Sequence, residues 1–214
     1  MGRVTLAQSG RMVWIARHGH RMDMADESWA LTAANPYDPP LSPLGVAQAA
    51  DLSARLAGER IAHIVTSPFE RAVATAAPLA AALGVSIKIE PGIAEWMNPQ
   101  WFRRRPMWRP PSALAALHGV VDVGYISPID VAFPATWDDL LLRTQTAVRL
   151  ILETFDGSVL FVGHGASVMG IASALSPGAQ VSGELCCLIR FAKHGGTWVL
   201  EDSGSTSHWV RGGG

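Results

Sequence analysis

The feature that most constrains the fold is a unit that recurs three times: a short apolar run, an abrupt charged or polar residue, and the start of a helix. The apolar runs cover residues 12–16, 61–66 and 158–162. Each has the length and composition of a buried strand. Because strands that alternate with helices pack as a sheet covered on its faces, the sequence predicts an α/β fold. We expect a three-layer α/β/α sandwich with a largely parallel central sheet.

Helix signals separate these runs. Two Ser-Pro pairs, at residues 42–43 and 67–68, combine an N-cap residue with a proline in the first turn. They predict one helix that stops near residue 58 and another over residues 69–83. The remaining predicted elements are a strand over 85–89, a short helix over 112–117, helices over 138–155 and 167–174, and a hairpin over 184–201 that turns at 194–196.

Two stretches are irregular. Residues 22–41 include a proline-rich run, 35–40, in which prolines fix φ and remove donors; long loops of this kind are usually functional or disordered. Residues 95–137 hold four tryptophans and four arginines, and their prolines exclude a long helix. We interpret this second segment as a cap or insertion over one end of the sheet. Tryptophans that only attach a long loop to the body explain it equally well.

Composition narrows the function. With 214 residues, 49% of them hydrophobic, the chain predicts a single domain over residues 1–214. A net charge of -1 argues against nucleic acid. Residues 1–10 lack the apolar core of a signal peptide. No apolar run reaches the ~18 residues of a membrane span. We expect the tail, residues 212–214, to be disordered. Cys186 and Cys187 are adjacent, so that in a strand they would face opposite sides and form no disulfide, which indicates a reducing, cytoplasmic compartment.

Polar residues at the ends of the three runs suit an anion. They are Arg17 and His18, Ser67 with Arg71, and His164, with Arg21 as a further arginine. The carboxyl ends of parallel strands lie at one edge of a sheet, so these side chains should converge there. Guanidinium groups do not ligate metals, but they neutralise phosphoryl oxygens while a neutral imidazole attacks phosphorus. The set predicts a site for a phosphoryl group, with no metal and no cofactor.

The ordered motifs resemble the histidine phosphatase superfamily, which has the phosphoglycerate mutase-like fold. The motifs are Arg17-His18-Gly19, Ser67-Pro68-Phe69-Glu70-Arg71 and Gly163-His164-Gly165. The resemblance covers essentially the whole chain. Residues 17–23, 35–42, 90–96 and 110–114 are also similar to the suppressor-of-T-cell-receptor-signalling (Sts-type) phosphatase domains.

This resemblance implies a metal-independent phosphomonoesterase. His18 would be the nucleophile that becomes phosphohistidine. The phosphoryl oxygens would be held by Arg17, Arg21, Arg71 and His164. Glu95 would protonate the leaving oxygen and then activate water, and Trp96 beside it would partly desolvate the carboxyl group. Other carboxylates stay open as the acid: Asp23, Asp26 and Glu27.

Departures from the family pattern shape the alternatives. The residues after Gly19 differ from those of sugar-phosphate mutases, and Gly165-Ala166 after His164 differ from the acid phosphatase branch. A mutase-type phosphotransferase and a catalytically idle binding module stay open. We expect a phosphorylated small molecule or a phosphotyrosine-type substrate, no nucleic-acid or membrane partner, and a homodimer by resemblance only. The other histidines, His20 included, are interpreted as structural or surface residues.

Overall fold

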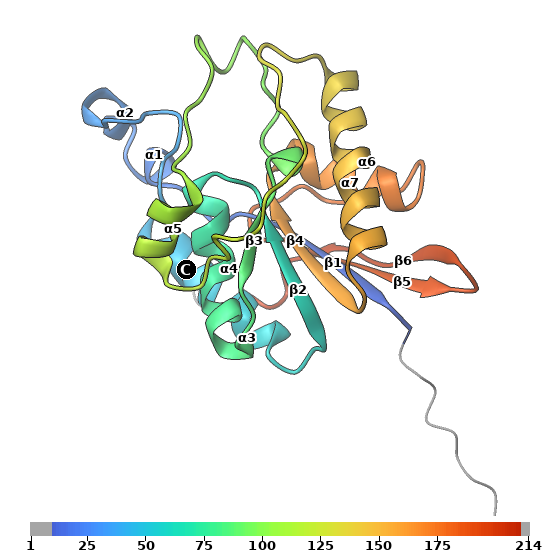
Figure 1. Ribbon diagram of the computed structural model, residues 1–214. Helices are drawn as coiled ribbons and strands as arrows, with labels where there is room; N and C mark the ends of the chain where they lie inside the picture. The colour runs from blue at the N-terminus through green and yellow to red at the C-terminus, as the bar shows by residue number, and fades with distance from the viewer. Residues whose placement is uncertain (1–9, 211–214) are drawn as a thin grey trace, which may run out of the picture.

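The computed structural model describes residues 10–210, in which six strands form one mixed sheet of order β3-β2-β4-β1-β5-β6 (Figure 1). The strands are β1 (Met12–Arg17), β2 (Ile61–Thr66), β3 (Ile87–Ile89), β4 (Ser158–Gly163), β5 (Leu188–His194) and β6 (Thr197–Ser205). The first four pair in parallel, whereas β5 runs antiparallel to β1 and β6 antiparallel to β5. The predicted largely parallel sheet is confirmed. The residues predicted to lack a signal peptide fall mostly, and the glycine tail entirely, outside the described range.

Helices cover both faces of the sheet, as the three-layer prediction requires (Figure 1). One face carries α3 (Pro43–Leu56), α4 (Glu70–Leu83) and α5 (Pro111–His118), and the other carries α6 (Trp137–Thr154) and α7 (Gly165–Leu175). The connections also hold two one-turn helices, α1 (Met22–Ala25) and α2 (Trp29–Thr32), and a 3-10 turn, η1 (Pro91–Ile93). No helix within residues 10–210 is long and apolar enough to cross a membrane.

Alternation along β1 divides the apolar core into two layers. Trp14 packs into the layer beneath α3, α4 and α5, whereas Val13 and Ile15 pack into the layer beneath α6 and α7, because successive strand residues point to opposite faces. The cysteines follow the same division: both are free, Cys186 in the first layer and Cys187 in the second. They precede β5 rather than lie within it, so their predicted placement in a strand is wrong although their opposite facing is confirmed.

The Ser-Pro signal holds at one site and fails at the other. Ser42 caps α3, its Oγ accepting the Gly45 N–H at 3.2 Å, as predicted. By contrast, α4 begins only at Glu70 with Phe69 as N-cap. Ser67 Oγ lies 2.7 Å from a histidine nitrogen and accepts the Phe69 N–H at 3.4 Å, ahead of the helix. The prediction of a cap at Ser67 is therefore wrong.

The boundaries of other helices and strands differ from the predicted ones because of local hydrogen bonds. The third strand is shorter than predicted, because the Val85 N–H bonds back to the Ala80 carbonyl at the end of α4. Helix α7 begins two residues earlier than predicted, because Ser167 Oγ accepts the His164 N–H from inside its first turn. The segment 22–41 is not a plain loop, since it contains α1 and α2.

The loop after β1 packs tightly on the start of α3. A Cβ on Gly45 would lie 2.1 Å from the His20 carbonyl oxygen, and one on Gly19 would lie 2.9 Å from the Gly45 carbonyl oxygen. Only glycine permits such backbone contact. This close approach fixes the position of the loop that carries the polar residues after β1.

Candidate active site

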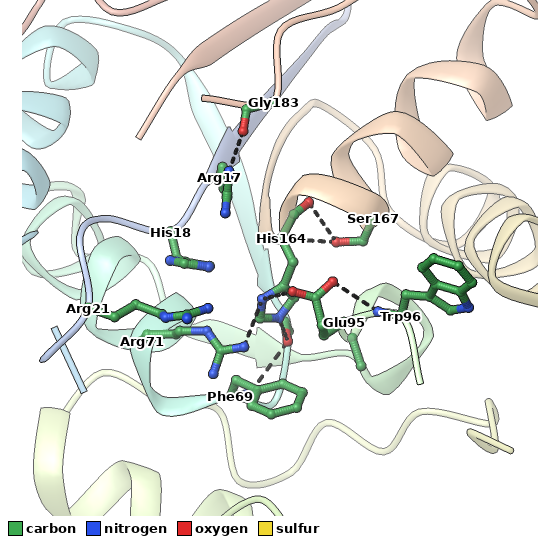
Figure 2. A network of polar contacts seen from close by, with 12 residues as sticks. Arg17, His18, Arg21, Phe69, Arg71, Glu95, Trp96, His164, Ser167 and Gly183 are labelled. Carbon is green, nitrogen blue, oxygen red and sulfur yellow. Dashed lines mark hydrogen bonds and ion pairs between the residues drawn. The ribbon is translucent and has the colours of Figure 1, made fainter. Parts of the chain in front are cut away.

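The polar residues predicted to converge lie together at the carboxyl ends of β1, β4 and β2 (Figure 2). The His18 N–H donates to the Gly163 carbonyl at the end of β4, at 2.9 Å. The Ser67 N–H donates to the Val162 carbonyl at 3.0 Å, which ties the end of β2 to the same strand. The rings of His18 and His164 meet edge to face, with centroids 5.2 Å apart. Backbone pairing of the sheet therefore places residues that are far apart in sequence.

The His18 imidazole is neutral and has a free lone pair on one nitrogen, as a nucleophile requires. Its Nδ1 lies 2.8 Å from the Gly19 carbonyl oxygen; a carbonyl can only accept, so this contact assigns the ring proton to Nδ1 and the lone pair to Nε2. Nε2 is buried and has no hydrogen-bond partner within residues 10–210. Burial, followed by the neighbouring Arg71 charge, lowers the pKa of His18 well below its usual value, so the ring is neutral.

His164 is held from three sides. Its Nε2 lies 2.7 Å from Ser67 Oγ, and its Nδ1 lies 3.2 Å from Arg71 Nη2 and 3.5 Å from Glu95 Oε2. The Phe69 ring packs edge to face against the imidazole, with centroids 5.1 Å apart. Burial, followed by the Arg71 charge, lowers the pKa of His164 well below its usual value. Two neutral imidazoles therefore stand beside one buried arginine.

Three arginines differ in how firmly they are held. Arg71 is 2% exposed and spans two partners, Asp38 and His164; burial lowers its pKa to about 10, so it is charged at neutral pH. Arg17 donates from Nη1 to the Gly183 carbonyl at 2.6 Å. Arg21 forms a two-pronged pair with Asp23, both contacts at 2.9 Å. Arg71 and Arg17 each keep a buried Nε that has no partner in the described part of the chain.

A cavity of about 680 Å³ opens over these groups. Its charged lining includes all three arginines of the predicted set and Glu95. Its apolar lining includes Met24, Tyr37, Trp101, Phe102 and Met169. Both histidines are fully buried beneath this lining. The cavity therefore has a cationic floor and an apolar rim.

Glu95 is the carboxylate that the fold places closest to the histidines. It is 8% exposed, and its Oε1 accepts the Trp96 N–H at 3.0 Å. Arg143 Nη2 donates to the carbonyls of Ala94 and Glu95, at 2.8 and 3.1 Å, and so fixes the backbone there.

The three alternative acids are less well placed. Asp23 lines the cavity but is engaged by Arg21. Asp26 accepts from Ser28, and Glu27 is exposed. The structure therefore brings Glu95, rather than these residues, to the paired histidines.

Several contacts were not evident in the sequence. Asp38 lies in the proline-rich run that we interpreted as loop chemistry, yet it is buried against Arg71. Ser67 pairs with His164 rather than capping a helix. His20 is not a free loop residue, since its Nδ1 lies 2.8 Å from Ser42 Oγ. An aspartate within a run of prolines was the one signal in the sequence, and polar residues in proline-rich loops are ordinary.

Within residues 10–210, no group of three or more histidine, cysteine, aspartate or glutamate side chains is arranged to hold a metal ion. Residues 13–205 match the model of the histidine phosphatase superfamily (branch 1). The chain belongs to this family, as the motifs predicted.

Two curated relatives are similar to this chain in sequence. The mouse ubiquitin-associated and SH3 domain-containing protein B is 27% identical over 246 residues, which cover 93% of this chain and 38% of the relative. The ecdysteroid-phosphate phosphatase of Bombyx mori is 28% identical over 205 residues, which cover 79% of this chain and 31% of the relative. The chain thus spans about a third of the length of these relatives. The predicted resemblance to the Sts-type branch is confirmed.

A solved structure shows the same fold. The crystal structure of the ecdysone phosphate phosphatase from Bombyx mori in complex with tungstate matches with a TM-score of 0.72 and 24% sequence identity. The match covers 89% of this chain and 91% of that chain. The phosphoglycerate mutase-like α/β fold is confirmed.

Proposed function

We propose that this chain is a metal-independent phosphomonoesterase that hydrolyses phosphate esters through a phosphohistidine intermediate on His18. One observation carries the proposal: His18 Nε2 is buried, carries a free lone pair, and lies in a site flanked by three arginines. A neutral imidazole in a cationic site suits attack on a negatively charged phosphoryl group.

The chemistry follows from the contacts. His18 Nε2 forms the N–P bond as the ester O–P bond breaks, while Arg17, Arg21, Arg71 and His164 hold the phosphoryl oxygens. The His18 Nδ1–H remains bonded to the Gly19 carbonyl and stabilises the positive charge that develops on the ring. Glu95 gives its proton to the leaving oxygen. It then takes a proton from the water that attacks phosphorus, the N–P bond breaks, and phosphate leaves with His18 neutral again.

The rim of the cavity supports a finer proposal about the substrate. Its large apolar and aromatic side chains, which include Tyr37, Trp101 and Phe102, suit a phosphate ester with a bulky apolar or aryl leaving group. A phosphorylated small molecule and a phosphotyrosine-type substrate both have this form. Residues 95–137, which contribute Trp101 and Phe102 to the rim, would then act as the cap within a single domain.

The location and assembly of the protein are also proposals. Cys186 and Cys187 are buried free thiols, which a reducing, cytoplasmic compartment would preserve. The homodimer expected from the resemblance stays a prediction.

Hydrolysis of para-nitrophenyl phosphate in the presence of a chelator tests the activity. We expect wild type to turn over, His18→Ala to lose all turnover, and the matched control His194→Ala, on the exposed end of β5, to keep it. Activity that the chelator removes would contradict the metal-independent mechanism. A folded wild-type protein without activity on aryl or alkyl phosphates would favour the idle binding module instead.

A further inference from the structure

We propose that Asp38 is a positioning residue of the phosphoryl site, which acts by holding the Arg71 guanidinium against His164. The inference rests on the proposed function, because it assigns to Arg71 a phosphoryl-binding role. It adds a residue outside the set of histidines, arginines and glutamate that the motifs identified.

The contacts of Asp38 tie it to α4 and to Arg71 at once. Its Oδ1 lies 3.5 Å from Arg71 Nη1, and the side chains of both residues are only 2% exposed. Both of its carboxylate oxygens also accept the N–H of Glu70, the first residue of α4, at 3.0 and 3.3 Å. A movement of Asp38 would therefore be transmitted to the helix start and to the guanidinium.

The Arg71 guanidinium is fixed on three sides. Nη1 meets Asp38, Nη2 lies 3.2 Å from His164 Nδ1, and the Phe69 ring lies 4.3 Å from the guanidinium carbon. Only Nε is without a partner in the described part of the chain. Because a planar guanidinium recognises phosphoryl oxygens through a fixed fork, its orientation decides how well it binds them.

The charge of Asp38 also matters. Arg71 is buried in a site where the charge of Arg21 repels it, and the carboxylates of Glu95 and Asp38 offset that repulsion, with Asp38 the one that forms an ion pair with it. An uncompensated buried charge is strongly unfavourable. The other charged groups that face Asp38 are Glu70 and Arg109, which pair with each other at 2.9 Å.

The backbone around Asp38 is fixed by its neighbours. Prolines follow it at residues 39 and 40, and the Asp38 N–H donates to the Asn35 carbonyl at 3.2 Å. The adjacent residues Tyr37 and Pro39 line the cavity. This proline-rich run therefore forms part of the cavity wall and also places the Asp38 carboxylate in contact with Arg71.

A double-mutant cycle tests the inference. The variants are Asp38→Asn, Arg71→Ala and their combination, with Asp51→Asn, another buried aspartate on α3, as the matched control. For each we would measure kcat and KM with para-nitrophenyl phosphate, the Kd of inorganic phosphate by calorimetry, and the melting temperature.

Asp38→Asn keeps an acceptor for the Glu70 N–H but removes the charge. We expect it to weaken phosphate binding about tenfold and to lower kcat while raising KM, since a 1 Å misplacement costs up to about 10²-fold. In the Arg71→Ala background the same change should alter each constant by less than about twofold, because residues that act through one another are not additive. Asp51→Asn should leave kcat, KM and the Kd of inorganic phosphate within twofold of their wild-type values.

Two results would overturn the inference: an Asp38→Asn variant within twofold of wild type, or effects that multiply in the double variant. If Asp38→Asn does not fold, Asp38→Glu replaces it, since one added methylene displaces the carboxylate; unchanged phosphate affinity there would also overturn it. Coupled effects on phosphate binding in a protein that hydrolyses no ester would uphold the positioning role while rejecting the proposed hydrolase.

Discussion

The floor and the rim of the cavity are built in different ways. The floor is the charged lining, and its buried Arg71 is held by Asp38 and His164. His18 and His164 are buried beneath it, and the His18 ring contacts the Gly19 carbonyl. The rim comes mainly from the segments 22–41 and 95–137, with Met169 of α7, and it includes side chains as exposed as Trp101, at 54%. Under the proposed function, the reaction would depend on the floor at the sheet edge, and the choice of leaving group would depend on the rim.

The largest effect should come from the floor. Arg71→Ala is expected to lower kcat/KM of aryl phosphate hydrolysis about 10²–10³-fold, comparable with the loss of one donor to a developing charge in other active sites. Inorganic phosphate binding should weaken as well, because the guanidinium binds ground state and transition state alike. A variant that loses turnover but binds phosphate as tightly as wild type would reject this role.

Glu95 lies between the floor and the rim, and its test depends on the leaving group. Glu95→Gln should slow an alkyl phosphate about 10²-fold, since general acid catalysis contributes 10²–10⁴-fold. An activated ester such as para-nitrophenyl phosphate needs little protonation and should lose much less. Steady-state rates on a series of esters would show this as a steeper dependence on the leaving-group pKa. Equal losses across the series would reject Glu95 as the acid.

Substitutions in the rim should change the affinity for the substrate rather than the rate of the chemical step. Trp101→Ala is expected to raise KM for an aryl phosphate about tenfold, the size of effect that loss of an apolar contact produces. The Kd of inorganic phosphate should not change, because phosphate reaches only the floor. Trp209→Ala, at another exposed tryptophan that does not line this cavity, is the control. A change in phosphate affinity would show that floor and rim are not independent.

The smallest expected effect is on how the free energy of unfolding depends on pH. Both catalytic-site histidines have folded-state pKa values well below 6.5, so below about pH 6.5 the unfolded chain binds protons that the folded chain does not. The free energy of unfolding therefore falls as pH drops, by up to about 1.4 kcal/mol per pH unit for each ring.

His18→Gln should make this slope shallower by one ring's contribution between pH 6.5 and 5, measured by urea denaturation. Asp38, whose pKa burial raises to about 6, contributes with the opposite sign between about pH 4 and 6, but it does so in both proteins. Identical slopes in the variant and wild type would show that the His18 ring titrates normally in the fold.

The residues at and beneath the floor could be predicted from the sequence because regular secondary structure positions them. The end of a buried strand and the first turn of a helix are readable from local patterns, and the parallel sheet then brings His18, Arg71 and His164 together without further information. The strands over β1, β2 and β4 and the cap at Ser42 were predictable for this reason.

The remaining contacts depend on packing between distant segments. Asp38 meets Arg71 across 33 residues and Ser67 meets His164 across 97, and no local pattern distinguishes such a serine from a helix cap. The path of residues 95–137 depends on apolar contacts of Met97, Val131 and Ala135 with Phe69. These contacts have no sequence period, so the shape of this segment could not be derived from the sequence.

The most direct test of the mechanism is detection of the phosphoryl group on His18 itself. Wild-type protein mixed with excess para-nitrophenyl phosphate would be quenched in alkali within one turnover and its peptides analysed by mass spectrometry. We expect an acid-labile, alkali-stable phosphoryl group on the peptide that contains His18, formed in step with a burst of nitrophenol. Turnover without any enzyme-bound phosphate, or a phosphoryl group on a different residue, would contradict the central claim.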